Sequence, residues 1–300
     1  MSSITKVALA GAKGNLGEAV LDQLLKAGFQ VTALTRQGTT HTFPSGVTVK
    51  AVDYDSIDSL TDALQGQDAV VVTLGGEALG KQFLLIEAAV KAGVKRFIPS
   101  EFGSDTFNEK TAQLPGYRDK IEVQKAVKKA AAESGITWTA VACGPFLDWG
   151  VSASFLVNAK DRKIELPDGG NLKTSTTTLA DVGRAVVGVL RNLEQTKNRV
   201  VYVQSAVITQ RKLLEYVKKV VGSDGWTEDV TSIDEQVRLS FAEAEKENPN
   251  FWVLFGGTVK AAIWKEGYGG LFQKLDNDLL GVKQMTDAEV AAVVAQSVPK

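Results

Sequence analysis

Residues 6–17 read KVALAGAKGNLG, a short apolar run followed at once by three glycines spaced three residues apart. The spacing places Gly11, Gly14 and Gly17 between a strand and the first turn of a helix. Glycine at such a junction allows a tight turn and lets a pyrophosphate group approach the helix N-terminus. The stretch therefore predicts a Rossmann-type unit that binds a dinucleotide; the alternative is a glycine-rich turn without a ligand. The loop residues expected to bind are Gly11, Lys13, Gly14, Asn15, Leu16 and Gly17.

The first half of the chain repeats this pattern of a short apolar run followed by an amphipathic stretch. Such alternation is typical of a parallel sheet covered by helices on both faces. Expected strands are residues 6–10, 30–35, 48–52, 69–74, 96–99 and 137–142. Expected helices carry apolar residues at helical spacing: Leu16, Val20 and Leu24; Ile57, Leu60 and Leu64; Phe83, Ile86 and Val90. Each expected helix ends at a glycine, Gly28, Gly66, Gly93 or Gly135, the last closing a fourth helix. The predicted fold class is α/β, a doubly wound parallel sheet.

After residue 142 the alternation of short apolar runs and amphipathic stretches becomes less regular, which predicts a second, smaller lobe. A threonine-rich segment precedes an expected helix at 179–191, and an expected strand at about 199–203 returns to the main sheet. We therefore expect a Rossmann domain over residues 1–150 and mainly a C-terminal substrate-binding lobe over residues 151–300. Asn248-Pro249-Asn250 should end a charged helix, so that the aromatic run 251–255 packs against the substrate lobe or forms ordinary core.

The composition excludes several function classes. The 34 Lys and Arg nearly balance the 35 Asp and Glu, so no net field favours nucleic acid or an anionic membrane as partner. Cys143 and His41 are the only residues of their kinds, which leaves no disulfide and no zinc-like cluster. No apolar run reaches the roughly 18 residues that span a bilayer, and no signal pattern precedes the first strand. We expect a cytoplasmic protein with a small-molecule substrate and no metal, either a monomer or a homodimer.

The end of the second expected strand indicates which dinucleotide binds. An NAD site usually places an acidic residue there, on the ribose 2′-hydroxyl. Here the residues are Thr35 and Arg36, and a guanidinium can pair with a 2′-phosphate, so NADP(H) is predicted. The alternative for Arg36 is a solvated arginine at the strand end. Asp53 is expected to accept a hydrogen bond from the adenine amino group, and the alternative is an acidic residue at the start of a helix. Residues expected beside the ribose and pyrophosphate are Thr73, Leu74, Gly75 and Gly76.

Residues 92–103 read AGVKRFIPSEFG, and on this segment the chain resembles the isoflavone reductase-like and NmrA-like group of atypical short-chain dehydrogenases. The glycine loop has the spacing of short-chain and extended reductases, and residues 144–149, GPFLDW, and 176–185 are similar to the fungal branch. The resemblance implies NADPH-dependent reduction of an aromatic or polyketide-derived substrate. It also implies a catalytic lysine in the helix after the fifth strand.

Lys120 is the best match to that lysine. The pattern Tyr-x-x-x-Lys is absent, because Tyr117 stands three residues before Lys120. Independently, Lys120 lies one turn before Val123 and two turns before Val127 on the stripe expected to face the protein. A lysine near a cationic nicotinamide could donate a proton or stabilise an enolate. The alternative is a structural lysine paired with Glu101 or Asp119.

An ungapped alignment with the family gives a different result. Counting back from residues 135–139, GITWT, places Gln124 where plant members carry their lysine, and a one-turn insertion is needed to align Lys120. Under the ungapped alignment the catalytic lysine is missing.

The remaining site residues follow from their places at strand ends. Ser100 is expected to contact the nicotinamide or the substrate, and a turn serine is the alternative. Aromatic residues on the same rim are expected to form an apolar wall for the substrate, with core packing as the alternative: Phe102, Tyr117, Phe146 and Trp149. Further cofactor contacts are expected from Pro99, Gly144, Pro145 and Phe146, and from Lys120 and Ser100 themselves. Neither Cys143 nor His41 has the partners of a nucleophile or a base, although His41 stands near the expected 2′-phosphate end.

Three functions remain open from the sequence. The first is an NADPH-dependent reductase of an aromatic or enone metabolite, with Lys120 as acid. The second is an NADP(H)-sensing regulator without turnover, which needs no acid in the cleft. The third is a dehydratase, isomerase or cyclase on the same fold, which would turn over substrate without net oxidation of NADPH.

Overall fold

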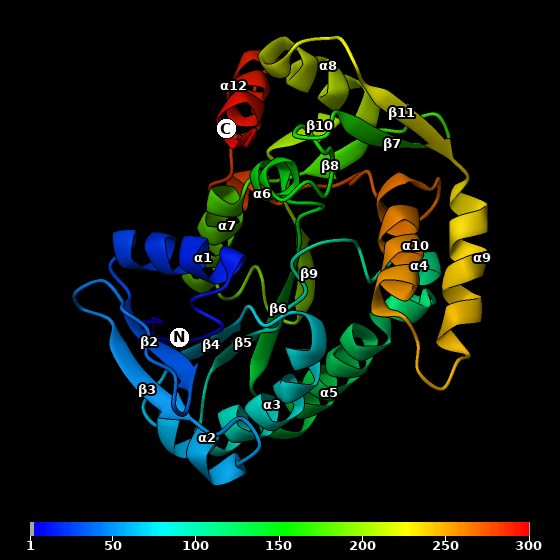
Figure 1. Ribbon diagram of the computed structural model, residues 1–300. Coiled ribbons are helices and arrows are strands. Elements are labelled where there is room, and N and C mark those ends of the chain that lie inside the picture. The colour runs from blue at the N-terminus through cyan, green and yellow to red at the C-terminus, as the bar shows by residue number, and fades with distance from the viewer. Residues whose placement is uncertain (1–2, 300) are drawn as a thin grey trace.

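The computed structural model describes residues 3–299 and is built around one parallel sheet (Figure 1). The sheet has seven strands in the order β3-β2-β1-β4-β5-β6-β9, all paired in parallel. The predicted fold class is therefore confirmed. The strands are β1 (Lys6–Ala10), β2 (Gln30–Arg36), β3 (Thr48–Val52), β4 (Ala69–Val72), β5 (Arg96–Ile98), β6 (Thr137–Ala142) and β9 (Arg199–Tyr202).

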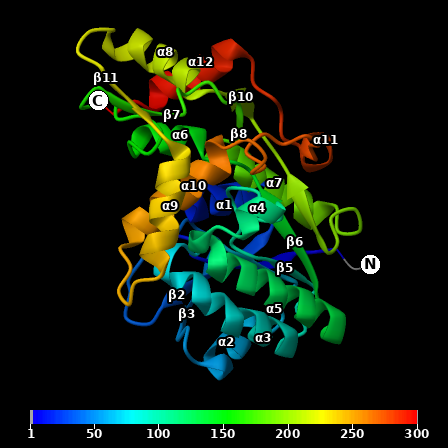
Figure 2. The same ribbon diagram turned by 90° about the vertical axis from the view of Figure 1, so that its right-hand side faces the viewer.

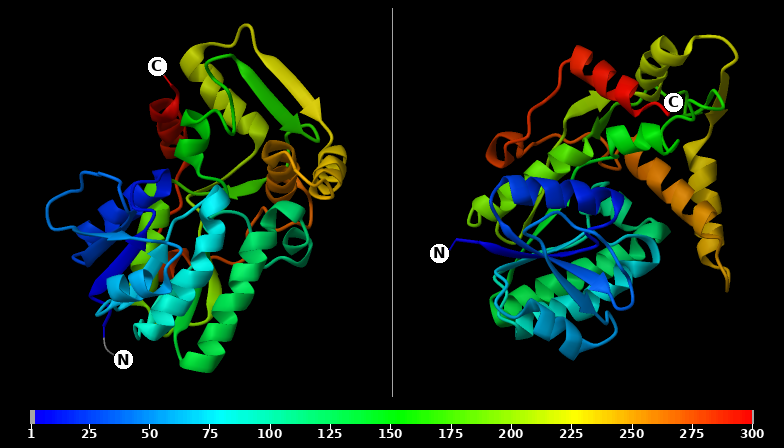
Figure 3. Two further views of the ribbon diagram at one scale, coloured as in Figure 1. Left: turned by 60° about the horizontal axis from the view of Figure 1, so that its bottom comes forward. Right: turned by 60° about the vertical axis from the view of Figure 1, so that its left-hand side comes forward.

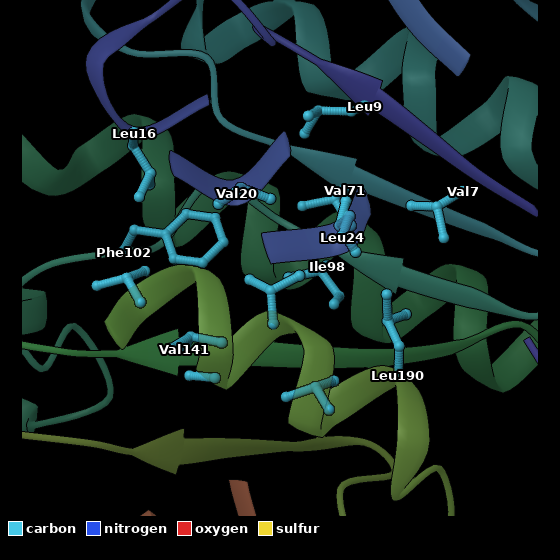
Figure 4. Packing of buried hydrophobic residues seen from close by; sticks show 14 of the residues in the cluster. Val7, Leu9, Leu16, Val20, Leu24, Val71, Ile98, Phe102, Val141 and Leu190 are labelled. Atoms are coloured by element: carbon cyan, nitrogen blue, oxygen red, sulfur yellow. The ribbon is translucent and has the colours of Figure 1, made fainter. Parts of the chain in front are cut away.

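Helices cover both faces of the sheet because its central strands β1, β4 and β5 bury apolar residues on both sides. One face packs against α1 (Asn15–Lys26) and α7 (Leu179–Arg191), and Figure 4 shows Val20, Leu24 and Leu190 in that layer. The other face packs against α2 (Ile57–Leu64), α3 (Gln82–Lys91) and α5 (Arg118–Ser134), the lower layer in Figure 2. The glycines expected to end the first helices have φ between +70° and +86°.

One residue of an expected helix face is wrong. Phe83 is 42% exposed, whereas Ile86 is buried as expected and Val90 is partly buried. Helix α3 also buries Leu85 and Ala89, which belong with Ile86 to the core on that face of the sheet, and Phe83 lies outside it.

The smaller lobe has its own core and two short sheets above the main sheet (Figure 1). Strand β7 (Lys163–Pro167) pairs in parallel with β11 (Thr227–Thr231), and β8 (Thr174–Thr176) pairs antiparallel with β10 (Ala206–Ile208). Its helices are α6 (Leu147–Ser152), α8 (Gln210–Val221), α9 (Ile233–Ala244), α10 (Phe251–Trp264) and α12 (Asp287–Ser297). Short elements complete the fold: η1 (Gly76–Lys81), α4 (Glu109–Ala112), η2 (Pro115–Tyr117) and α11 (Asn277–Leu280). None of the helices between residues 3 and 299 has the length and apolar character needed to cross a bilayer.

Most of the aromatic run 251–255 lies outside the core, although the partly buried Phe255 packs against the core of the smaller lobe. The charged helix α9 ends before the Asn-Pro-Asn turn, as expected, but the run itself is the first turn of α10, capped by the Asn250 side chain. Phe251, Trp252 and Val253 are 45%, 78% and 39% exposed. The α9–α10 pair projects from the body (right panel of Figure 3), so the first turn of α10 reaches past the lobe that was expected to cover it.

Arg96 is the largest fully buried side chain of the main domain and holds three segments together. Its guanidinium donates to the hydroxyls of Thr137, Thr139 and Thr196 at 2.9, 2.6 and 2.9 Å, and to the Leu193 carbonyl at 2.7 Å. Burial lowers its pKa to about 10, and the nearby charge of Glu194 opposes that change. The network therefore ties β5 to β6 and to the turn after α7.

Replacing Arg96 with methionine is expected to lower the free energy of unfolding by about 2 kcal/mol, because four acceptors lose a charged donor while the cost of burying the charge is removed. Urea unfolding monitored by circular dichroism measures this change. The neighbouring Lys95, whose exposed side chain pairs with Asp68 at 2.7 Å, provides the control. Lys95→Met should cost no more than about 1 kcal/mol, and equal losses from the two variants would contradict the role assigned to Arg96.

Candidate functional site

A cleft of about 830 Å³ opens at the carboxyl ends of β1, β2 and β4. In an open parallel sheet the strand order reverses between β1 and β4, and ligands bind at that edge. The residues expected to bind the cofactor that line this cleft are Gly11, Lys13, Gly14, Thr35, Arg36, Asp53, Thr73, Leu74 and Gly75. The other expected contacts, among them Ser100 and Lys120, lie outside the lining of this cleft.

The glycine loop is packed so closely that larger residues would not fit. A Cβ atom on Gly17 would lie 2.0 Å from the Gly11 carbonyl oxygen, and one on Gly11 would lie 2.8 Å from Thr73 Oγ1. The Gly14 amide donates to the Gly11 carbonyl at 2.9 Å, and no side chain within residues 3–299 caps the N-terminus of α1 at Gly14. The loop thus leaves amides of the first turn for an anionic ligand. Leu16 contributes only its backbone there, because its side chain packs in the core (Figure 4).

Cations and anions alternate around the outer end of the cleft. Lys13 pairs with Glu18 at 2.5 Å, and Lys81 pairs with Asp55 at 2.5 Å. Arg36 is exposed and takes part in no ion pair within the described residues 3–299. Its guanidinium is therefore available to a ligand.

Asp53 lines the cleft beside this arginine. Its carboxylate accepts the Asp55 amide at 2.9 Å, which shapes the turn before α2. The N-cap of α2 is Ser56, whose hydroxyl accepts the Ser59 amide, so the alternative of Asp53 as helix cap is wrong.

Several cleft residues were missed from the sequence. Tyr54 donates its hydroxyl to the Leu34 carbonyl at 3.2 Å, and burial raises its pKa to about 12, opposed by the charge of Arg36. Lys81 comes from η1, and Phe43 comes from the loop after β2. Neither segment carries a motif, so only the proximity of His41 to the outer end was noted from the sequence.

Lys120 extends its ammonium group toward the carboxyl ends of β5 and β6. Its Nζ donates to the main-chain carbonyl of Glu101 and lies 5.8 Å from the centre of the Tyr117 ring. The positive charge of Lys120 also acts to lower the pKa of Glu101 and of Cys143, which places it near both. No carboxylate in the described part of the chain lies within 4.0 Å of Nζ, so the expected alternative of an ion pair with Glu101 or Asp119 is wrong.

Gln124 lies one turn further along α5, and both protons of its side-chain amide are used in a buried hydrogen-bonded cluster. Its Nε2 donates to Glu101 Oε1 at 3.2 Å and to Thr106 Oγ1 at 2.8 Å, and the Thr106 hydroxyl donates to Glu101 Oε2 at 2.6 Å. Burial is the largest influence on the Glu101 carboxyl and raises its pKa. Glu101 was considered from the sequence only as an ion-pair partner, yet it is the acceptor that joins Lys120 and Gln124.

Ser100 directly precedes Glu101 in the sequence and contacts a residue that lines the cleft. Its hydroxyl donates to the carbonyl of the cleft-lining Leu74 at 2.6 Å, and its amide donates to Gln82 Oε1 at 2.8 Å. The single hydroxyl proton is thereby used, so Ser100 is placed to accept a hydrogen bond from a ligand. Pro99 and Ser100 follow directly on β5, which ends at Ile98.

Two of the expected substrate contacts are buried in the protein. Phe102 is 8% exposed and packs beside Leu16 and Val141 (Figure 4), as in its core-packing alternative. Tyr117 is 4% exposed, donates its hydroxyl to Ser104 Oγ at 2.8 Å, and has its pKa raised by burial.

The other two expected aromatic residues, at the start of α6, remain partly exposed. Phe146 and Trp149 have ring centres 6.4 Å apart, and Trp149 and Phe155 have ring centres 5.7 Å apart. Gly144 precedes them with φ +65°, and a Cβ atom there would lie 2.0 Å from the Ser175 carbonyl oxygen. Pro145 accepts the Thr176 hydroxyl at 2.7 Å through its carbonyl, so this turn is held against β8.

Cys143 is buried, and burial raises the pKa of its thiol to about 12. A thiol in this state is a poor nucleophile, in agreement with the expectation from the sequence.

The chain is similar to proteins of known family over most of its length. The profile of the NmrA-like family matches residues 3–247. The chain is 33% identical to the oxidoreductase poxI of Penicillium oxalicum, over 97% of this chain and 94% of that protein. It is 36% identical to the oxidoreductase aprR of Aspergillus flavus, over 80% of this chain and 82% of that protein. The solved structure of AtPrR2 with NADP+ and (+)pinoresinol superposes with a TM-score of 0.76 at 20% identity, covering 99% of this chain and 100% of the other.

Proposed function

Because this chain belongs to the NmrA-like family, we propose that it is an NADPH-dependent reductase of a small aromatic or enone-type metabolite. Its fungal relatives are oxidoreductases. The single observation that carries the proposal for the chemistry is the ammonium group of Lys120, which lies at the sheet edge without a carboxylate partner in residues 3–299.

The cleft fits NADP(H) in shape and charge. The close approach of Gly17 to Gly11 packs α1 against the glycine loop, so that the N-terminus of α1 would face a bound pyrophosphate. Amides of the first turn of α1 would hold the pyrophosphate, and Arg36 would hold the 2′-phosphate. The cleft-lining Thr73 to Gly75 segment would lie against the ribose groups. When bound, NADPH supplies the hydride.

The remaining chemistry belongs to residues of this chain. Hydride addition to an enone or a related conjugated system leaves negative charge on an oxygen, which needs a proton or a positive charge. Lys120 supplies either, and the Glu101 carbonyl orients its ammonium. Phe146 and Trp149 would offer an apolar surface for the aromatic part of the substrate.

The cofactor proposal predicts that NADPH binds at least about tenfold more tightly than NADH, which is about 1.4 kcal/mol. Arg36→Ala should lower NADPH affinity by about the same factor, because the guanidinium pairs with the 2′-phosphate. Isothermal titration of both proteins with both nucleotides measures how much of the preference for NADPH depends on Arg36. NADH, which lacks the phosphate, is the internal control and should bind both proteins alike. Equal affinities for the two nucleotides in the unmodified protein would refute the assignment.

A further inference from the structure

His41 is the single histidine of the chain and lines the same cleft as Arg36. It stands in the loop of residues 37–47 between β2 and β3. The His41 and Phe43 rings meet edge to face with centres 6.3 Å apart, and Lys13 Nζ lies 5.6 Å from the centre of the Phe43 ring. Phe43 also packs against the core that contains Leu16. The loop is therefore anchored over the glycine loop, which holds the exposed His41 at the rim of the cleft.

The charged groups that line the cleft supply too little unpaired positive charge to neutralise a bound 2′-phosphate. The groups that line the cleft are Lys13 from the glycine loop, Arg36 from β2, Asp53 and Asp55 from the turn after β3, and Glu77 and Lys81 from η1. Lys13 already faces Glu18, and Lys81 already faces Asp55. A phosphate monoester carries about −1.5 to −2 charges near neutral pH, so Arg36 alone does not neutralise one. Asp53, in the same lining, adds to the deficit.

We infer that His41 is a second determinant of NADP(H) specificity, which binds the 2′-phosphate as an imidazolium and makes the preference for NADPH over NADH increase as the pH falls. The inference rests on the proposed function of the same cleft. Histidine is the side chain whose charge ordinarily changes between pH 5 and 8, and a nearby phosphate favours its charged form. By linkage, a phosphate that promotes proton uptake is itself bound more tightly by the protonated protein.

The unique histidine allows a direct test by proton NMR on the intact protein. The imidazole C2 proton is followed against pH for the protein saturated with NADP+ and for the protein saturated with NAD+. We expect the titration midpoint to lie at higher pH in the NADP+ complex, because only that ligand carries the phosphate. Coincident midpoints would overturn the inference, since His41 would then not sense the phosphate.

Binding measurements on three variants provide a second test. In the unmodified protein, the ratio of the NADH to the NADPH dissociation constant should rise by about fivefold from pH 8 to pH 6.5. With His41→Gln the ratio should change much less, and with His41→Lys it should stay high throughout, because that charge is fixed. Thr42→Asn, in the same loop but outside the cleft lining, should behave like the unmodified protein. The titration of the ligand phosphate itself is common to the unmodified protein and Thr42→Asn, so that comparison controls for it.

The outcomes separate this inference from the function on which it rests. If NADPH binds tightly and the pH profiles of the unmodified protein and His41→Gln coincide, the role of His41 is refuted and the cofactor assignment stands. If neither nucleotide binds, or both bind equally at every pH with Arg36 in place, the cofactor assignment itself fails.

Discussion

Replacing Lys120 with methionine is expected to reduce turnover by at least about 100-fold, the usual contribution of a general acid. Methionine preserves the length and the apolar stem of the side chain but removes the ammonium. NADPH affinity should change by less than about threefold, because Lys120 does not line the cleft that the glycine loop and Arg36 form. The measurements are NADPH oxidation, followed by absorbance with a panel of enones and quinones, and direct titration of the nucleotide.

Lys125 provides a matched control on the same helix. It is exposed and pairs with Glu122 at 2.7 Å, so Lys125→Met should leave turnover unchanged. Unchanged turnover in the Lys120 variant would exclude Lys120 as the acid and direct attention to a water molecule, because the Ser100 hydroxyl proton and the Gln124 amide are already used in hydrogen bonds. Tight NADPH binding by the unmodified protein without oxidation by any compound of the panel would instead support a nucleotide sensor.

Replacing Gly17 with alanine is expected to reduce NADPH affinity by about 100-fold, which is about 2.8 kcal/mol. The added Cβ would lie 2.0 Å from the Gly11 carbonyl oxygen and 2.9 Å from the Ala12 Cα, and neither is the end of a flexible side chain. Helix α1 must then move away from the loop, and the amides that face the pyrophosphate move with it. Fluorescence titration with NADPH measures the loss.

Gly28→Ala is the control for general backbone strain. Gly28 has φ +86° at the far end of α1, and a Cβ atom there has no neighbour within 4 Å. Alanine should therefore cost about 1 kcal/mol of stability without a change in NADPH affinity. Circular dichroism shows whether the Gly17 variant is folded. A folded Gly17→Ala protein that binds NADPH as tightly as the unmodified protein would contradict the packing argument.

The local pattern was sufficient to predict most of the main sheet. Strands β1, β3 and β6 begin and end at the expected residues, and α7 does as well. Strands β4 and β5 are shorter than expected: Thr73 makes the last hydrogen bond to β1, at 2.9 Å from its amide to the Ala10 carbonyl, before the chain turns to line the cleft, and Pro99 follows the last paired residue of β5. Apolar periodicity predicts where strands and helices occur, but it does not predict the residue at which a paired strand ends and a cleft-lining loop begins.

The sequence by itself determined the βα unit around the glycine loop, since the spacing of Gly11, Gly14 and Gly17 is a local property of the backbone. It also placed Arg36 at the end of β2, where we expect the 2′-phosphate of NADP(H) to bind. Only the tertiary structure decided which side chains join these groups. The sheet brings His41, Tyr54 and Lys81 from separate segments to one cleft. It also turns Lys120 toward the Glu101 carbonyl while Gln124, one turn away, is held in the buried cluster. Contacts between residues far apart in sequence depend on strand order and helix packing, which the local pattern does not encode.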